Sequence, residues 1–228
     1  MSWLTQLYYR SPLNLNSFLA KVLPFHKYLF LDKLPKHVRE LHKLKSEFPK
    51  LSKSIQIENA EANSFLINWC QQMDWSKNRA VVFLDPYGMQ VNWELLQAIA
   101  NTKAIDLWLL FPLGVGVNRL LTREKFPEKS WADALTRIFG TEDWRSFYKP
   151  SSQPSLYGES TTECKSVDFE QIGNFFINRL ETIFPEVVKK PLQLCNSRNN
   201  PLYLFCFAAA NKTAIKIAGD IIGKTKRS

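Results

Sequence analysis

Short apolar runs alternate with amphipathic segments through the first half of the chain. Four apolar runs predict β-strands: Lys27–Asp32, Ser54–Ala60, Ala80–Pro86 and Ala104–Pro112. Three segments between them carry apolar residues at helical spacing and predict helices: Lys33–Pro49, Glu61–Met73 and Asn92–Thr102. The last two strands are apolar throughout, which is typical of parallel strands covered on both faces. Alternating strands and helices predict right-handed crossovers and a mostly parallel sheet.

The pattern changes after Pro112. A helix is predicted over Trp131–Gly140, and an irregular stretch with a short helical centre precedes it. Lys149–Ser166 is rich in serine, proline and threonine, so we expect a mobile loop there. The remaining residues predict an amphipathic helix, two strands in an antiparallel hairpin, and a closing helix: Val167–Pro185, Val187–Ser197, Pro201–Asn211 and Asn211–Ser228.

These elements predict a single domain over residues 1–228. Residues 27–112 would form a parallel α/β core, residues 113–166 a helical and loop insertion, and residues 167–228 a C-terminal helix, hairpin and helix. A chain of 228 residues with 45% hydrophobic residues can bury a large core. It contains no apolar run of 18 residues, so we expect no membrane span. The N-terminus lacks the features of a secretory signal, which favours the cytoplasm.

The excess of basic residues gives a net charge of +9. An electropositive face would attract a polyanion or an acidic partner, although many proteins carry such an excess without binding nucleic acid. Charge alone therefore leaves nucleic-acid binding as one alternative among several.

The residue types of familiar metal and catalytic sites are sparse. The four cysteines show no C-x-x-C spacing and the three histidines lie early in the chain, so neither a zinc site nor Ser/His/Asp catalysis is predicted. Cys70 and Cys206 lie in apolar runs, and we expect both to be buried free thiols. Four aromatic residues of the insertion are expected to pack it rather than to stack on bases: Trp131, Trp144, Phe147 and Tyr148.

Polar side chains end the first two predicted strands. In open α/β sheets ligands bind beyond the carboxyl ends of the strands, where Asp32 could accept the two ribose hydroxyls of a nucleoside cofactor. Asp32 could equally cap the following helix, and Lys33 is a competing partner. Asn59 and Glu61 follow the second strand and could bond an adenine amino group, although polar residues are common at such places.

The third strand ends in Asp85-Pro86-Tyr87-Gly88. Pro86 cannot continue a strand ladder, so the Asp85 carboxylate and the Pro86 carbonyl would be free to face a pocket. Two adjacent acceptors suit a substrate amine, and Tyr87 could stack on a flat base. We therefore predict Asp85, Pro86 and Tyr87 as substrate-side catalytic residues. A tight turn in which Asp85 makes only local bonds is the alternative.

The chain resembles the three-Cys-motif partner (TcmP) family of bacteria and mobile elements. The resembling segments are YLFLDK, SIQIENA, VVFLDPYGMQVNWELLQAIANTKAIDLWLLFPLG and LYLFCFAAANKTAIKIAGDII. The resemblance implies a Rossmann-like, class I methyltransferase-type fold, S-adenosylmethionine as cofactor, and work beside a three-cysteine protein similar to radical-SAM enzymes. Asp85–Gly88 is also locally similar to a motif of tRNA guanine-N2 dimethyltransferases, which faces the guanine amine.

The chain departs from this family at its start. Family members begin with a strand that ends in an acid, followed by a glycine loop that holds the methionine and ribose of the cofactor. No such segment precedes Lys27 here, so we expect a truncated or degenerate version with the methionine end unheld. The missing strand is central in this topology. Either the N-terminal residues fill the gap between the Asp32 strand and the Asp85 strand, or those strands close up.

Three functions are compatible with these residues. The first is a methyltransferase-like enzyme acting on a nucleobase amine, with Asp32, Asn59 and Glu61 on the cofactor side. The second is a non-catalytic partner or scaffold for a three-Cys-motif protein in a mobile-element or defence system, docking through its basic face and Lys149–Ser166. The third is a basic nucleic-acid-binding module without catalysis.

Overall fold

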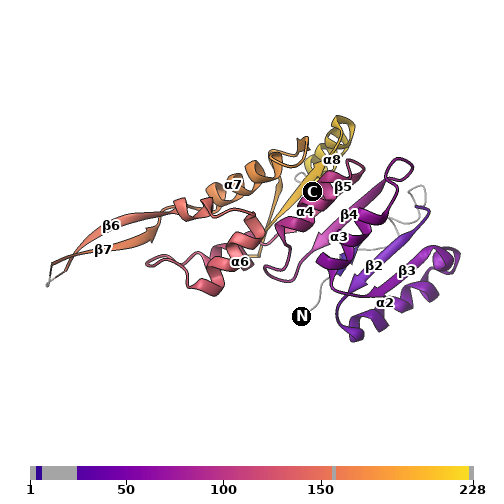
Figure 1. Ribbon diagram of the computed structural model, residues 1–228, viewed down its shortest axis with the longest axis horizontal. Helices are drawn as coiled ribbons and strands as arrows, with labels where there is room; N and C mark the ends of the chain where they lie inside the picture. The colour runs from indigo at the N-terminus through magenta and orange to yellow at the C-terminus, as the bar shows by residue number, and fades with distance from the viewer. Residues whose placement is uncertain (1–3, 7–24, 156–157, 226–228) are drawn as a thin grey trace.

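The computed structural model describes residues 4–6, 25–155 and 158–225. Its main sheet has eight strands in the order β3-β2-β1-β4-β5-β10-β8, with β9 also paired to β10 (Figure 1). The strands are β1 (Leu4–Gln6), β2 (Tyr28–Asp32), β3 (Ile55–Asn59), β4 (Ala80–Asp85), β5 (Ile105–Phe111), β8 (Glu186–Val187), β9 (Leu192–Cys195) and β10 (Pro201–Ala209). Only β1 and β10 run against the other six, because each is antiparallel to its neighbours. The sheet is therefore mostly parallel, as predicted.

The helices of the first half lie where the sequence pattern places them. The α-helices are α2 (Pro35–Glu47), α3 (Ala62–Gln72), α4 (Trp93–Asn101), α5 (Asn118–Leu120), α6 (Lys129–Phe139), α7 (Phe169–Glu181) and α8 (Lys212–Thr225). Three short turns of other helix types are η1 (Pro49–Ser54), η2 (Leu113–Val117) and η3 (Asp143–Phe147). The pairs β2–β3 and β4–β5 are parallel and are connected through α2 and α4, which confirms that helical crossovers join them.

The N-terminal strand β1 fills the gap between β2 and β4. Thr5 pairs with Leu31 of β2 on one side and with Leu84 of β4 on the other, and both pairings are antiparallel. Of the two ways to close the sheet, the chain therefore uses its own N-terminal residues. The strand runs opposite to its neighbours, so its amino end lies where β2 and β4 end.

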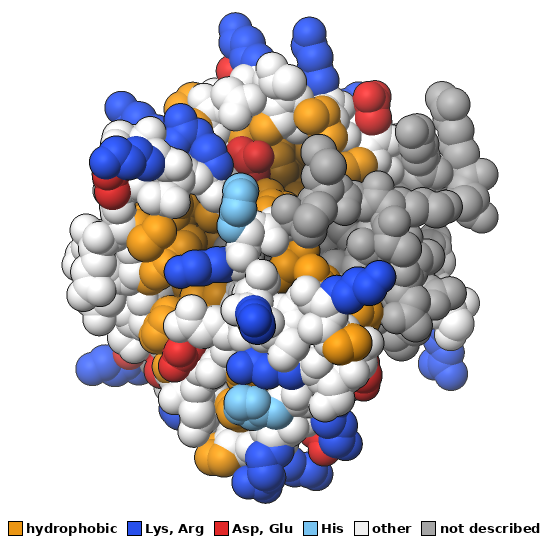
Figure 2. Space-filling view, turned by 90° about the vertical axis from the view of Figure 1, so that its right-hand side faces the viewer, with side chains coloured by type: hydrophobic (Ala, Val, Ile, Leu, Met, Phe, Trp, Pro, Cys, Tyr) orange, Lys and Arg blue, Asp and Glu red, His pale blue; other side chains and the backbone are white. Residues whose placement is uncertain are grey.

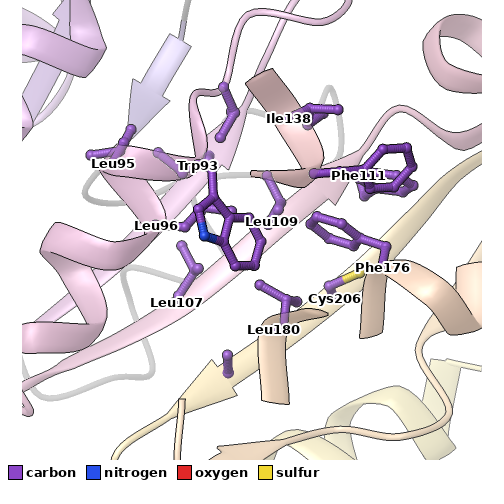
Figure 3. Packing of buried hydrophobic residues seen from close by; sticks show 14 of the residues in the cluster. Trp93, Leu95, Leu96, Leu107, Leu109, Phe111, Ile138, Phe176, Leu180 and Cys206 are labelled. Atoms are coloured by element: carbon purple, nitrogen blue, oxygen red, sulfur yellow. The ribbon is translucent and has the colours of Figure 1, made fainter. Parts of the chain in front are cut away.

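Helices cover both faces of the sheet. The larger apolar cluster joins α3, α4, α6 and α7 to one face, while α2 packs on β2 and β3, and α8 on β10, at the other face. Figure 3 shows side chains of four elements meeting in the larger cluster: Trp93 and Leu96 of α4, Leu109 and Phe111 of β5, Phe176 of α7, and Cys206 of β10. The rings of Phe111 and Phe176 stack with centroids 3.8 Å apart. Cys70 and Cys206 are buried in this cluster, as predicted, and both are free thiols.

The insertion is packed by aromatic residues. Trp144 is fully buried, stacks on Phe126 with ring centroids 5.4 Å apart, and donates its indole N–H to Thr136 Oγ1 at 3.0 Å. Phe147 and Tyr148 are also buried, which confirms the packing prediction for them, whereas Trp131 is 37% exposed. Gly140 ends α6 in the left-handed conformation, with φ of +66°.

The prediction of a mobile loop over Lys149–Ser166 is wrong in its secondary structure. Strands β6 (Tyr148–Ser155) and β7 (Gly158–Lys165) form a two-stranded antiparallel ribbon that projects from the body (Figure 1). Both strands are edges, so the prolines of β6 remove no ladder bond as long as their nitrogens face outward. The ribbon's base is tied down, because Lys165 N donates to Arg123 O at 2.9 Å and Ser166 N donates to Phe147 O at 2.8 Å. The loop prediction rested on amino-acid composition, and composition carries no information about pairing between strands.

The predicted C-terminal hairpin is present as β9 and β10. Its turn is organised by Asn196, whose side-chain oxygen accepts from Arg198 N at 2.9 Å and from Asn200 N at 3.0 Å. Asn199 takes a positive φ of 58° there. The short strand β8 was not predicted separately, because its two residues carry no period. In the described part of the chain, none of the helices has the length and apolar character needed to cross a bilayer.

Candidate functional site

The carboxyl ends of β2, β3 and β4 meet at one end of the sheet, which we call the carboxyl end. Thr5 of β1 pairs with both Leu31 and Leu84, so Asp32 and Asp85 end their strands at the same level on either side of β1. Two strand spacings separate them, or about 10 Å. Asn59 pairs with Asp32 across the parallel ladder. The structure therefore brings Asp32, Asn59 and Asp85 to one end of the sheet.

Asp32 has a local structural task. Its side chain is 1% exposed, Oδ1 accepts from Leu34 N at 2.7 Å, and Oδ2 lies 3.1 Å from His37 Nδ1. Both oxygens thus serve the start of α2. The carboxylate is therefore used locally, but it does not cap α2 as the alternative supposed, because it bonds the residue before the helix, and its side-chain partner is His37 rather than Lys33.

Asn59 and Glu61 are also engaged within the fold. Asn59 Nδ2 donates to the backbone oxygens of Asp32 and Lys33, each at 2.9 Å. Glu61 caps α3, because its carboxylate accepts from Asn63 N at 3.0 Å and from Ser64 N at 2.9 Å. Burial raises the pKa of Glu61, but these hydrogen bonds outweigh it and leave that pKa lowered.

Asp85 differs from the other three residues. Its carboxyl group is half-buried, burial raises its pKa, and it forms no hydrogen bond or ion pair with any other described residue. Pro86 beside it is buried, and Tyr87 is 59% exposed. Tyr203 of β10 lies close by, since its pKa is raised first by burial and then by the negative charges of Asp85 and Tyr87. A half-buried carboxylate without a partner can accept hydrogen bonds from a ligand.

A polar groove of about 640 Å³ lies beyond the carboxyl ends of β2, β3 and β4. Its polar lining comes from four elements and their loops: Lys33, Glu61, Asn63, Gln90, Asn92 and Arg137. Asn63 is 8% exposed and holds the wall together, because its Oδ1 accepts from Asn92 N and its Nδ2 donates to Gln90 O, each at 3.0 Å. Gln90 Oε1 is buried and has no hydrogen-bond partner among the described residues.

The sequence-based site omits most of this groove. Gln90 and Asn92 follow Asp85-Pro86-Tyr87-Gly88 directly, so the same strand-to-helix connection could have signalled them. Arg137 comes from the insertion, and no local pattern relates it to β4. Groups of three potential metal ligands were not found in the ranges that the structure describes.

Comparison with family models, with curated proteins and with solved structures finds no match for this chain. The residues therefore have to be judged by their own geometry. The three candidates for holding S-adenosylmethionine are committed to the fold as they stand, because Asp32 and Glu61 use both carboxylate oxygens in local hydrogen bonds and Asn59 uses its amide nitrogen. The antiparallel β1 also presents its amino end here, so no loop leaves it at this end of the sheet.

Proposed function

We propose that the protein binds a nucleobase-containing ligand at the carboxyl end of its sheet, through the connection between β4 and α4. The observation that carries this proposal is Asp85, a half-buried carboxylate whose pKa is raised and which has no partner among the described residues. An exocyclic amine would supply the missing donor. Tyr87 projects beside it and offers a flat face to a base.

The polar groove on the α3–α4 side of the same strand ends suits the rest of a nucleotide, although Asp85, Pro86 and Tyr87 are not among the residues that line it. Its volume of about 640 Å³ lies within the usual range for small-molecule sites. Lys33 and Arg137 are exposed cations on its rim, which suit a phosphate group. Of what the TcmP resemblance implies, this proposal keeps only the recognition of a base by Asp85, Pro86 and Tyr87. It does not include methyl transfer by this chain.

Calorimetric titration with AMP, CMP and UMP tests the proposal. Asp85→Asn exchanges one acceptor oxygen for a donor, so it should weaken AMP and CMP about tenfold and UMP by less than about twofold. Arg137→Gln should weaken all three monophosphates and leave the nucleosides unaffected. The control is Asp106→Asn, a second half-buried acid at the opposite end of the same sheet. Absence of heat with every nucleotide, or equal binding by D85N and the wild type, would overturn the proposal.

S-adenosylmethionine separates this proposal from the methyltransferase alternative. We expect no heat with that ligand at high micromolar concentration, since Asp32 is committed to α2. If the wild type binds S-adenosylmethionine and Asp32→Asn abolishes that binding with the helix content unchanged, Asp32 holds the cofactor and the proposal is contradicted.

A second candidate function is docking of a partner protein, and one feature of the ribbon favours it. Pro150 and Pro154 stand four pairs apart on β6, so their nitrogens face the same side of that strand, and on its outer edge they would remove two donors. Strand β7 contains no proline, and its outer edge can accept an added strand. A three-Cys-motif protein is the partner that the sequence resemblance implies.

Co-purification of the two proteins tests this second candidate. Thr161 pairs with Ser152, which lies between the two prolines, so Thr161→Pro should remove an outward donor and abolish capture. Thr161→Val is the matched control and should leave capture unchanged. Equal capture by both variants would exclude strand addition at β7.

A further inference from the structure

Basic side chains gather at the end of the sheet opposite the groove, which we call the amino end. Each parallel strand of the core is preceded by one, and one more follows β10: Lys27, Lys53, Arg79, Lys103 and Lys212. All five are exposed. Figure 2 looks onto this side of the molecule, and blue side chains are spread over it around an apolar hollow.

The strand register aligns these cations in a row. Tyr28 pairs with Ile55 and Ala80 with Ile105, so the strands that follow Lys27, Lys53, Arg79 and Lys103 begin at matching levels. From β3 to β10 the row crosses five strand spacings, roughly 24 Å. One strand of duplex DNA presents a phosphate about every 3.4 Å along the axis, so the row could face several phosphates at once.

The negative charges of the acidic residues at this end are partly neutralised by neighbouring cations or by burial. Asp74 at the end of α3 pairs with Lys77 at 3.5 Å, and Asp106 is half-buried in the hollow together with Arg79 and Lys103. Burial raises the pKa of Asp106, while the charge of Arg79 acts in the opposite direction. Glu47 is a further exposed acid at the end of α2. An anion would therefore meet the lysines of the rim rather than the floor of the hollow, whose volume is about 300 Å³.

Lys103 adds an independent observation. It follows α4 with φ of +52°, in the left-handed region where glycine is favoured and a side chain costs energy. Its backbone N–H bonds Ala100 O at 3.1 Å, which closes the helix and would be available to glycine as well. A lysine at this helix end also suits the helix dipole, and it places a positive charge at this surface where glycine would satisfy the backbone with less strain.

We propose that the amino end of the sheet binds the phosphodiester backbone of nucleic acid through Lys27, Lys53, Lys103 and Lys212. The contacts are to phosphates, so binding is independent of base sequence and falls steeply with salt. This surface lies at the other end of the sheet from the nucleotide groove. It stands whether or not the groove binds a nucleotide.

Fluorescence anisotropy with a 20-base-pair DNA duplex and a 20-nucleotide single strand tests the proposal between about 50 and 200 mM NaCl. The triple variant Lys27→Gln, Lys53→Gln, Lys103→Gly should lower the logarithmic salt slope by about 3, one per lysine, and weaken binding at least about tenfold at 100 mM salt. The matched control removes the same charge from the insertion, through Lys125→Gln, Lys129→Gln and Lys149→Gln, and should change affinity by less than about twofold.

Three outcomes would overturn the proposal. One is no binding of either DNA at 50 mM salt. Another is an equal loss in the two triple variants, which would assign binding to net charge alone. The third is lysine-dependent binding to vesicles of anionic lipid without binding to DNA. Thermal melting followed by circular dichroism shows whether the variants are folded. Lys103→Gly alone should melt no lower than the wild type, because glycine adopts the positive φ without strain.

Discussion

Burial of the Asp85 carboxyl group carries a cost that no residue in the described part of the chain relieves. Burial raises the pKa of this group, and the described residues offer it neither a hydrogen bond nor a counter-ion. Asp106, at the other end of the sheet, is also half-buried, but the charge of Arg79 favours its ionised form. A residue that is unfavourable for folding, and lies at a strand end next to an exposed tyrosine, is better explained by a ligand than by packing.

The first prediction concerns the pH dependence of this cost. A carboxyl group with a raised folded-state pKa gives stability that is full below its unfolded pKa and is lost as pH rises through the folded value. Asp85→Asn should therefore raise the melting temperature at pH 7–8, and this gain should vanish towards pH 3–4. Thermal denaturation at several pH values measures it. An equal rise in melting temperature at every pH would contradict the argument from burial. Asp106→Asn should raise the melting temperature less, because the charge of Arg79 already favours the ionised form of Asp106.

The second prediction concerns Gly140, where α6 meets α4. A methyl group there would lie 2.0 Å from Trp93 Cγ, and φ is +66°. Gly140→Ala should cost at least about 2 kcal/mol through overpacking and backbone strain. The control is Gly219→Ala in α8, where no atom lies within 4 Å of the added carbon, and a gain of about 0.5–1 kcal/mol is expected. Urea denaturation measures both, and equal effects would refute the close approach.

At the scale of elements, Asn63 joins two parts of the site. Its side chain bonds Glu61 Oε1, Gln90 O and Asn92 N, and so ties the start of α3 to the connection between β4 and α4. Helix α3 begins at a capping acid for the usual reason that its first amides need acceptors. The groove wall therefore depends on a helix cap that binds no ligand itself.

The third prediction follows from this link. Asn63→Leu should cost about 2–3 kcal/mol, because it leaves buried backbone groups of Gln90 and Asn92 unpaired. It should also weaken nucleotide binding more than Ser64→Ala, which removes hydrogen bonds at the exposed side of the same cap. Denaturation and calorimetry on both variants measure this. If Asn63→Leu folds and binds the nucleotide with unchanged affinity, the helix cap does not contribute to ligand binding in the groove.

Periodicity predicted the elements of the first half well for a physical reason. In β4 and β5 buried residues alternate with half-buried ones, and α4 buries Trp93, Leu95, Leu96 and Ile99 on one side, so the apolar pattern of these elements follows their packing. The ribbon β6–β7 has no such signal, because its pairing partner rather than a core defines it. Arg137 and Tyr203 reach the carboxyl end from distant segments, so their places could not be predicted from local spacing. The roles of Asp85, Tyr87, Asn59 and Glu61 as ligand contacts stay predictions.

At the scale of the whole molecule, one sheet carries two polar ends of different character. The carboxyl end has mixed charge and a carboxylate, that of Asp85, without a partner among the described residues, whereas the amino end has a row of basic side chains. The six parallel strands make this separation possible, since they all start at one end and finish at the other, while β1 and β10 run the opposite way. Five of the 30 basic residues lie together at the amino end, so their placement suggests a role that the net charge of +9 alone does not.

The fourth prediction concerns β1, which pairs on both sides. Thr5→Pro removes a backbone donor from a central strand, and should lower the free energy of unfolding by several kcal/mol, on the order of 3. Thr5→Val keeps the backbone bonds and should fold normally. Urea denaturation distinguishes them. Equal stability of T5P and wild type would show that β2 and β4 hold together without this strand.

The position of β1 also bears on how the chain is made. Strand β1 precedes its second partner β4 by more than 70 residues, so during synthesis it must wait, paired at most on one side, until Ala80–Asp85 has emerged. In that interval β2 exposes backbone groups that a second nascent chain could bind. Bulky fusions at the N-terminus should therefore lower the yield of soluble protein more than the same fusions at the C-terminus. Such fusions would lower the yield of folded protein and leave ligand binding by the folded protein unchanged.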